Sequence, residues 1–313
     1  MEKPLEPFNE LSVHRYQFNC QLKSSLTLND YSGSMLRGAF GMALRKLACV
    51  TKMDNCKACL LYRQCAYPQV FEPAPPESAA FQNFSQIPSP YIIEPPPMGR
   101  QTLQAHEMLS YNLILIGHAI THLPLIIYAW QSAMKKGLGK DRVQAELKTV
   151  VFEPNKTDEQ IIYNSLQGEL IAVADDKETL LPKPDKKISL KLITPLRIKQ
   201  NGQILSSNIQ GKDFLMALVR RYYLLQEFYS TNYQSPDFSL LAKQANAIES
   251  KVTVKWSEWE RYSSRQKQKM VFGGVLGKIE LSGNLLPFIS LLIQGQWLHV
   301  GNKTSFGMGR YQI

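Results

Sequence analysis

The sequence predicts an α+β fold in which one order of elements, β-α-β-β-α-β, occurs twice along the chain. Segments that alternate apolar and polar residues, as strands with one buried face do, are interleaved with segments whose apolar residues recur at helical spacing. The length of 313 residues suits two domains better than one. Residues 175–187 are rich in charge, contain two prolines and form the expected linker between the halves.

The first half contains one complete set of these elements. Residues 11–22 alternate as a strand, and residues 35–48 place apolar side chains at helical spacing. A cysteine-rich insertion follows at 49–67. Proline and serine then dominate 71–97, so only a short edge strand at 91–93 is expected. The remaining expected elements are a strand at 109–116, a helix at 121–136 that ends at Gly137, and a strand at 145–152.

The second half repeats the order without repeating the sequence. It is expected to hold strands at 188–199, 252–259, 271–281 and 306–313, and helices at 211–228 and 285–293. Two such units are typical of tandem ferredoxin-like, or RRM-like, domains with antiparallel sheets and helices on one face. We expect domains at 1–180 and 181–313, the second with a glycine-rich loop near its C-terminus.

The charge distribution favours a nucleic-acid ligand. Lys and Arg total 36 against 26 Asp and Glu, and residues 251–278 alone hold seven basic and two acidic side chains. The N-terminal residues lack the apolar core of a signal peptide, and no apolar run reaches the length of a membrane span. We therefore expect a cytoplasmic protein without a membrane partner.

The glycine-rich ending, LHVGNKTSFGMGRYQI at 298–313, suits a polyanion. Glycines leave the backbone open to a phosphate chain, and basic side chains supply the charge, although the same spacing also occurs in ordinary hairpins and bulges. The residues expected to bind are Gly301, Lys303, Gly307, Gly309 and Arg310.

The basic segment before this loop is the main predicted RNA-binding surface. Basic side chains neutralise phosphates, polar ones bond to base edges or 2′-hydroxyls, and the interleaved Trp256, Trp259 and Tyr262 can stack on unpaired bases. The alternative is an edge strand whose tryptophans belong to the core and whose lysines are solvated. The candidates are Arg261, Ser264, Arg265, Gln266, Lys267 and Lys269.

Four segments of the chain are similar to one known family. They are SGSMLRGAFGMALRKLAC at 32–49, LITPLRIKQNG at 192–202, WSEWERYSSRQKQKMVFGGVLGKIELSG at 256–283 and FISLLIQGQWLHVGNKTSFGMGRYQI at 288–313. The chain thereby resembles the CRISPR-associated endoribonucleases of the RAMP superfamily that cut precursor CRISPR RNA. The resemblance implies tandem ferredoxin folds, repeat RNA or crRNA as ligand, and other CRISPR effector subunits as partners.

The resemblance also implies metal-independent cleavage, in which the ribose 2′-OH attacks the adjacent phosphate and leaves a 2′,3′-cyclic phosphate and a 5′-OH. This reaction needs a base, a proton donor and positive charge. His299 beside the glycine-rich loop is the candidate base or acid, Tyr31 can orient the 2′-OH, and Arg37 and Lys46 can stabilise the phosphate. Each also has a structural reading: a strand-end histidine, a turn tyrosine and a solvated helix face.

One departure from the family pattern favours rival functions. Relatives often carry a histidine on the first helix, where this chain has Met42 and no histidine between positions 15 and 105. The rivals are a protein of the same fold that binds the repeat without cutting it, and a scaffold subunit that coats guide RNA.

The cysteine-rich insertion is a candidate metal site. Cys49, Cys56, Cys59 and Cys65 give the spacing C-x6-C-x2-C-x5-C, and four thiolates can surround one ion. Structural zinc is the first candidate, with an iron–sulfur cluster and free cysteines as alternatives. Four protein ligands leave no open coordination position, so any metal here is expected to be structural. The resemblance implies that no cofactor takes part in catalysis.

Overall fold

The computed structural model divides the chain into two compact units, one of Ser12–Lys177 and one built on Glu178–Ile313. It describes residues 11–74, 87–154, 159–172, 187–206, 208–231, 233–263 and 268–313. Most of the expected linker, and with it the expected boundary at 180/181, falls between residues 173 and 186 and lies outside the described residues. We call the two parts the N-terminal unit and the C-terminal unit.

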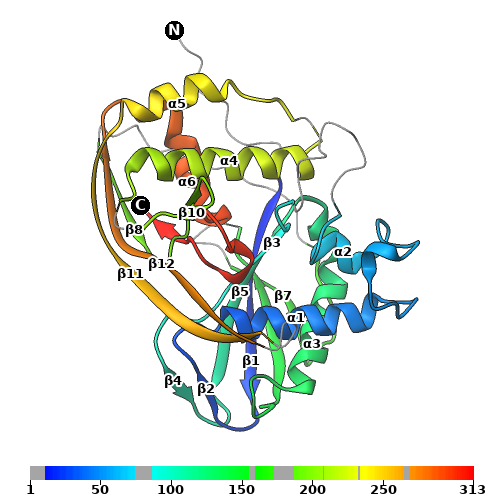
Figure 1. The fold of residues 1–313 in the computed structure, drawn as a ribbon. Coiled ribbons are helices and arrows are strands. Elements are labelled where there is room, and N and C mark those ends of the chain that lie inside the picture. Colours follow the sequence, from blue (N-terminus) through cyan, green and yellow to red (C-terminus); the bar gives the residue numbers. More distant parts are fainter. Residues whose placement is uncertain are drawn as a thin grey trace. The chain divides into compact units, whose positions relative to one another are not determined.

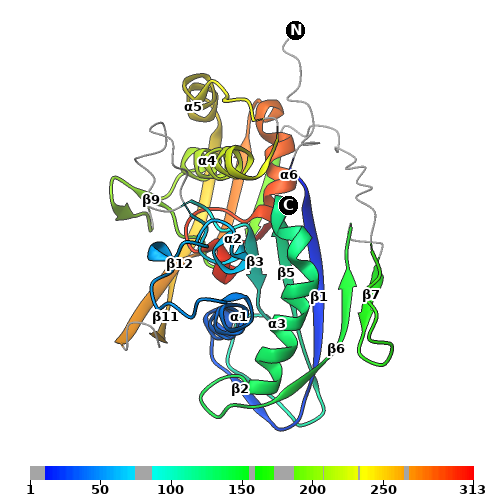
Figure 2. The same ribbon diagram turned by 90° about the vertical axis from the view of Figure 1, so that its right-hand side faces the viewer.

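The N-terminal unit is an antiparallel sheet in the order β3-β5-β1-β6-β7, with α1 and α3 packed together over it (Figure 2). Phe40 of α1 stacks on Trp130 of α3 at 5.2 Å between ring centroids, and Trp130 contacts Phe18 of the sheet. The elements are β1 (Val13–Leu22), β2 (Leu26–Leu28), α1 (Gly33–Ala48), α2 (Ala66–Val70), β3 (Tyr91–Glu94), β4 (Gln101–Leu103), β5 (Met108–Ile116), α3 (Leu123–Lys136), β6 (Ala145–Phe152) and β7 (Gln160–Asn164).

The C-terminal unit has a sheet in the order β11-β12-β8-β13. Tyr311 joins its last strand to the helices, because its ring meets Phe214 at 5.1 Å and its hydroxyl donates to the carbonyl of Leu292. The elements are β8 (Lys187–Leu192), β9 (Lys199–Gln200), β10 (Gln203–Ile204), α4 (Gly211–Tyr229), α5 (Phe238–Asn246), β11 (Glu249–Ser263), β12 (Gln268–Ser282), α6 (Ile289–Leu298) and β13 (Tyr311–Gln312).

Both units share one topology. When the four strands of the repeated β-α-β-β-α-β set are numbered along the chain, β3-β5-β1-β6 and β11-β12-β8-β13 both read 2-3-1-4. This is the ferredoxin-like arrangement, in which the first and third strands of the motif lie next to each other in the centre of the order. The predicted tandem ferredoxin-like α+β fold is confirmed.

The prediction of a last strand at 306–313 is largely wrong. Only Tyr311 and Gln312 pair with β8, and the residues before them form a tight turn. Lys303, Gly307 and Gly309 have φ values of 66°, 87° and 78°, in the left-handed region that no strand uses. None of the helices that the structure describes is long and apolar enough to cross a membrane.

Candidate functional site

The start of α1 holds Tyr31 in a buried position. Its side chain is 5% exposed, and burial, followed by the negative charge of Glu94, raises its pKa above the ordinary value. The phenol therefore stays protonated through neutral pH. It can orient or protonate a neighbouring oxygen, but it cannot act as a general base at neutral pH.

Arg37 and Lys46 lie on opposite sides of α1. Nine residues separate them, which is two and a half turns and about 13 Å along the axis. Arg37 is half-buried, with its guanidinium carbon 4.3 Å from the centre of the Phe71 ring, whereas Lys46 is exposed. The expectation that both steady one phosphate is wrong, because no single phosphate can meet opposite faces of a helix.

The four cysteines surround one cavity of about 330 Å³ without forming a metal site. Among the described residues no three His, Cys, Asp or Glu side chains are grouped so that they would hold an ion. Cys65 Sγ donates to the carbonyl of Ala48 at 3.7 Å, and Cys59 Sγ lies 3.3 Å from the Thr51 hydroxyl. Burial raises the pKa of the Cys56 thiol. The arrangement does not support the expected metal site of Cys49, Cys56, Cys59 and Cys65.

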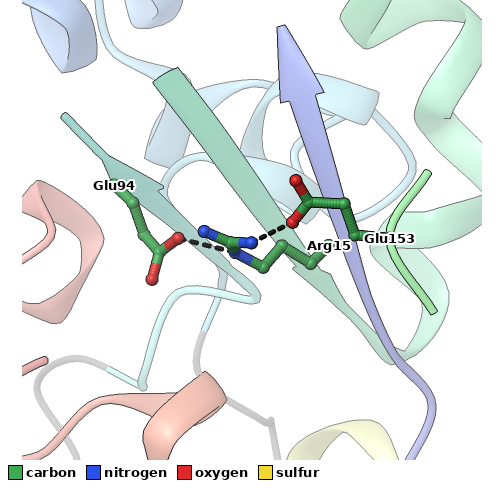
Figure 3. A network of polar contacts seen from close by, with 3 residues as sticks. All are labelled: Arg15, Glu94 and Glu153. Carbon is green, nitrogen blue, oxygen red and sulfur yellow. Dashed lines mark hydrogen bonds and ion pairs between the residues drawn. The ribbon is translucent and has the colours of Figure 1, made fainter. Parts of the chain in front are cut away.

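A charged network that the sequence did not reveal joins three parts of the N-terminal unit (Figure 3). Arg15 of β1 donates from Nε to Glu94 Oε2 at 2.8 Å and from Nη1 to Glu153 Oε2. The exposed fractions of Glu94 and Glu153 are 3% and 7%. Burial raises the pKa of Glu153, against the opposing charge of Arg15. The arginine thus bridges two buried carboxylates and ties the end of β3 to the end of β6 across β1.

His299 ends α6 and is fully buried, with a left-handed φ of 56°. Its Nδ1 lies 3.1 Å from the carbonyl oxygen of Met308. Because a carbonyl only accepts, the hydrogen of this contact is on Nδ1. The histidine therefore holds the glycine-rich loop through Nδ1.

The glycines of the loop serve contacts within the protein. The amide of Gly309 donates to the carbonyl of Pro195 at 3.0 Å, and that of Gly307 donates to the carbonyl of Thr304 at 2.7 Å. A Cβ at Gly309 would overlap the carbonyl of Val300. The amides of Gly307 and Gly309 are thus not available to a phosphate, contrary to expectation.

The side chains of the loop are better placed than its amides. Lys303 is exposed, with its ammonium 5.7 Å from the ring centre of Phe272 and 5.9 Å from that of Phe306. Gly301 and Arg310 are partly exposed. A cation of the loop therefore lies over aromatic rings contributed by the loop and by β12.

The basic segment forms a long hairpin of β11 and β12, fifteen residues each (Figure 1). β12 pairs with β8 only over Lys278–Ser282, so the outer part of the hairpin is a two-stranded ribbon. Trp259 is buried against Phe272, as the alternative reading expected, whereas Trp256 is 41% exposed.

The tip of this hairpin is only partly described. Arg261 and Lys269 lie in the paired strands, opposite Met270 and Tyr262 respectively. The other predicted RNA contacts, Ser264, Arg265, Gln266 and Lys267, lie outside the described residues.

Hairpin and loop form one packed surface within the C-terminal unit. Phe272 of β12 meets Phe306 of the loop edge-to-face at 5.5 Å. Arg197, before β9, donates to the carbonyl of Gly273 at 2.8 Å, and its own carbonyl accepts from Asn302 at 2.7 Å. The two segments singled out in the sequence are therefore fixed to each other, although about thirty residues separate them along the chain.

Comparison with known proteins agrees with this geometry. Residues 190–311 match the family described as CRISPR-associated endoribonuclease Cas6, and residues 11–175 match the N-terminal domain named AF_1859_N. No curated protein matches the chain.

Solved structures share the fold at low sequence identity. A Cas6 product complex is 14% identical with a TM-score of 0.58, covering 96% of this chain and 98% of that one. A partial Cas6-RT-Cas1–Cas2 complex is 12% identical with a TM-score of 0.57, covering 99% of this chain and 47% of that one. Thermus thermophilus Cas6 is 12% identical with a TM-score of 0.52, covering 97% and 99%. Residues 190–311 therefore form a domain of the CRISPR-associated Cas6 endoribonuclease family, within a tandem fold that the chain shares with these solved structures.

Proposed function

We propose that this protein binds the hairpin of CRISPR repeat RNA and cleaves precursor crRNA without a metal ion, through attack of the 2′-OH on the adjacent phosphate. The observation that carries the proposal is the Cas6 match over 190–311, because it encloses both the basic hairpin and the glycine-rich loop packed against it. We place the protein in the cytoplasm, with CRISPR repeat RNA and other CRISPR effector subunits as partners.

RNA binding is assigned to the hairpin and the loop. Exposed Trp256 can stack on an unpaired base, and exposed Lys303 can neutralise a phosphate. Arg261 and Lys269 add charge from the paired strands, and Ser264, Arg265, Gln266 and Lys267 stay predicted RNA contacts. This distribution of aromatic, basic and polar residues suits a folded RNA that lies along the hairpin.

The chemistry is assigned to three side chains. His299 is the proton carrier, because its imidazole lies beside the glycine-rich loop, where its Nδ1 donates to the carbonyl of Met308. Tyr31, whose pKa is raised, donates a hydrogen bond or a proton, and Arg37 offsets the negative charge that develops on the phosphate.

A second candidate function is supported by two observations. The first helix lacks a histidine, and His299 is fully buried. A member of the family with no accessible proton carrier would hold the repeat without cutting it.

One experiment separates the two functions. Purified protein is incubated with end-labelled repeat RNA in EDTA, and the cut site is mapped. A single 2′-deoxy substitution at that nucleotide should abolish cleavage and leave binding intact, whereas the same substitution one nucleotide downstream should change neither. An RNA that binds but stays whole over hours assigns the protein to the non-cleaving class.

A further inference from the structure

A second basic site lies in the N-terminal unit, between the C-terminal halves of α1 and α3. It is a cavity of about 310 Å³. Its rim carries Lys46 of α1, Lys135 and Lys136 of the last turn of α3, and Arg142 of the turn that follows. Met42 and small residues of both helices form the rest of the wall, so the cavity has an apolar floor and a cationic rim.

The charges of this rim are not neutralised by the protein. No acidic residue lines the cavity, and none of the four cations has a carboxylate within 4.0 Å among the described residues. Four like charges around one opening repel one another, so an anion that enters relieves the repulsion.

Helix ends alone do not explain the cluster. The negative C-terminal ends of α1 and α3 attract cations, which accounts for Lys46, Lys135 and Lys136. Arg142 is different, because it belongs to neither helix and has a left-handed φ of 52°, which costs a side chain of this kind about 1 kcal/mol.

The turn that carries Arg142 is rigid. Leu138 and Val143 exchange two backbone hydrogen bonds of 2.8 and 3.0 Å. Gly137 lies so close to the carbonyl of Arg142 that a Cβ there would overlap it. The backbone that bears the fourth cation is therefore fixed at the edge of the cavity.

We propose that this cavity binds one nucleotide of the single-stranded flank of the RNA, with its phosphates on the four cations and its base or ribose against Met42 and the apolar floor. A volume near the lower end for small-ligand sites accepts one nucleotide and excludes a duplex. The inference rests on the proposed function for the identity of the anion, and it adds a binding site remote from the hairpin and the loop.

The test compares two variants that lose the same charge. The first replaces Lys46, Lys135, Lys136 and Arg142 by alanine, and the control replaces the exposed Arg100, Lys199, Lys212 and Lys243. Binding of a repeat hairpin, with and without its single-stranded flank, is measured over a range of salt concentrations. Both variants are first checked for native circular dichroism and melting.

For the flanked RNA, the cavity variant should bind roughly 10-fold more weakly than the control. The slope of log K against log salt should fall by about 1.4, because the nucleotide is flanked by two phosphates that contribute roughly 0.7 each. For the flankless hairpin the two variants should agree. Equal affinity of both variants for flanked RNA overturns the proposal, whereas failure of the wild-type protein to bind any hairpin overturns the proposed function instead.

A second measurement uses the unaltered protein. A flank carrying 4-thiouridine should cross-link to peptides within 39–46 or 132–143, which line the cavity. Cross-links confined to other peptides contradict the proposal. Protection of the cavity lysines from acetylation by polyglutamate, but not by flanked RNA, would also overturn it, in favour of an acidic protein partner.

Discussion

Removal of the Arg15 guanidinium should destabilise the N-terminal unit more than any other single truncation in the charged network. Arg15→Ala leaves the buried carboxylates of Glu94 and Glu153 without the cation that bridges them. Loss of one partner of a buried ion pair costs about 3–5 kcal/mol, and the 18% exposure of Arg15 favours the lower figure. For a unit of this size, about 3 kcal/mol corresponds to a melting point lowered by roughly 6–12 °C.

The loss should depend on pH in a defined direction. A carboxyl whose pKa is higher in the folded than in the unfolded state makes the protein less stable as pH rises through the interval between those two values. Burial already raises the pKa of Glu153 above its usual 4.5, and removal of Arg15 raises it further. The loss of stability caused by Arg15→Ala should therefore be greatest at pH 7 and become smaller as the pH is lowered toward 4.5.

Differential scanning calorimetry of the wild type and variants at pH 5 and pH 7 measures both effects. Arg15→Lys keeps the charge but cannot bridge two carboxylates, so it should recover about half of the loss. Glu153→Gln added to Arg15→Ala should also recover part of it. A melting point of Arg15→Ala within 2 °C of the wild type, or an equal deficit at both pH values, would refute the reasoning.

Three further outcomes are expected. Gly309→Ala should cost more than 2 kcal/mol in urea unfolding, because its Cβ would overlap the backbone, whereas Gly202→Ala, with similar φ and open space, should cost about 1; equal costs would contradict the packing argument. His299→Asn keeps a donor for Met308, so it should slow cleavage by roughly 100-fold with RNA affinity nearly unchanged, and a wild-type rate would make His299 a positioning residue. Tyr31→Phe should slow cleavage. Because the pKa of Tyr31 is raised, ionisation of its phenol should not lower the wild-type cleavage rate up to pH 10. A fall in the wild-type rate below pH 10 that the Phe variant does not show would contradict the buried phenol.

Local patterns in the sequence predicted much of the fold, because strand alternation or helical spacing marks several elements. Residues 11–22 alternate as a strand of a sheet with one buried face, 145–148 begin with the same alternation, and 211–228 has helical spacing. The strand predicted at 306–313 was wrong for a physical reason. Left-handed backbone at Lys303, Gly307 and Gly309 turns the chain where apolar residues alone suggested a strand.

The candidate site could be predicted less completely, because its geometry depends on contacts between distant segments. Arg15, Glu94 and Glu153 meet only once three strands are aligned, although a charged residue directly after an apolar strand, as in VVFE at 150–153, was a usable signal. Lys46 was assigned to the phosphate of Arg37 from its place on the same helix. Helical periodicity could have separated the two, since nine residues reverse the face.

The glycines illustrate a related limit. Their spacing indicated a flexible backbone open to phosphate, and the same lack of Cβ instead permits close packing against Val300 at Gly309 and against Arg197 at Gly301. Sequence alone does not distinguish a ligand from the protein's own carbonyl as the neighbour of a glycine.

The central claim is that this protein recognises folded repeat RNA through its C-terminal unit. The most direct measurement is the affinity of the purified full chain for its repeat hairpin at low ionic strength, beside a hairpin of the same length with a scrambled stem and loop. We expect tight binding of the repeat hairpin and at least 10-fold weaker binding of the scrambled one, since base contacts add to phosphate contacts. Equal affinity for the two hairpins, or none for either, would contradict the claim.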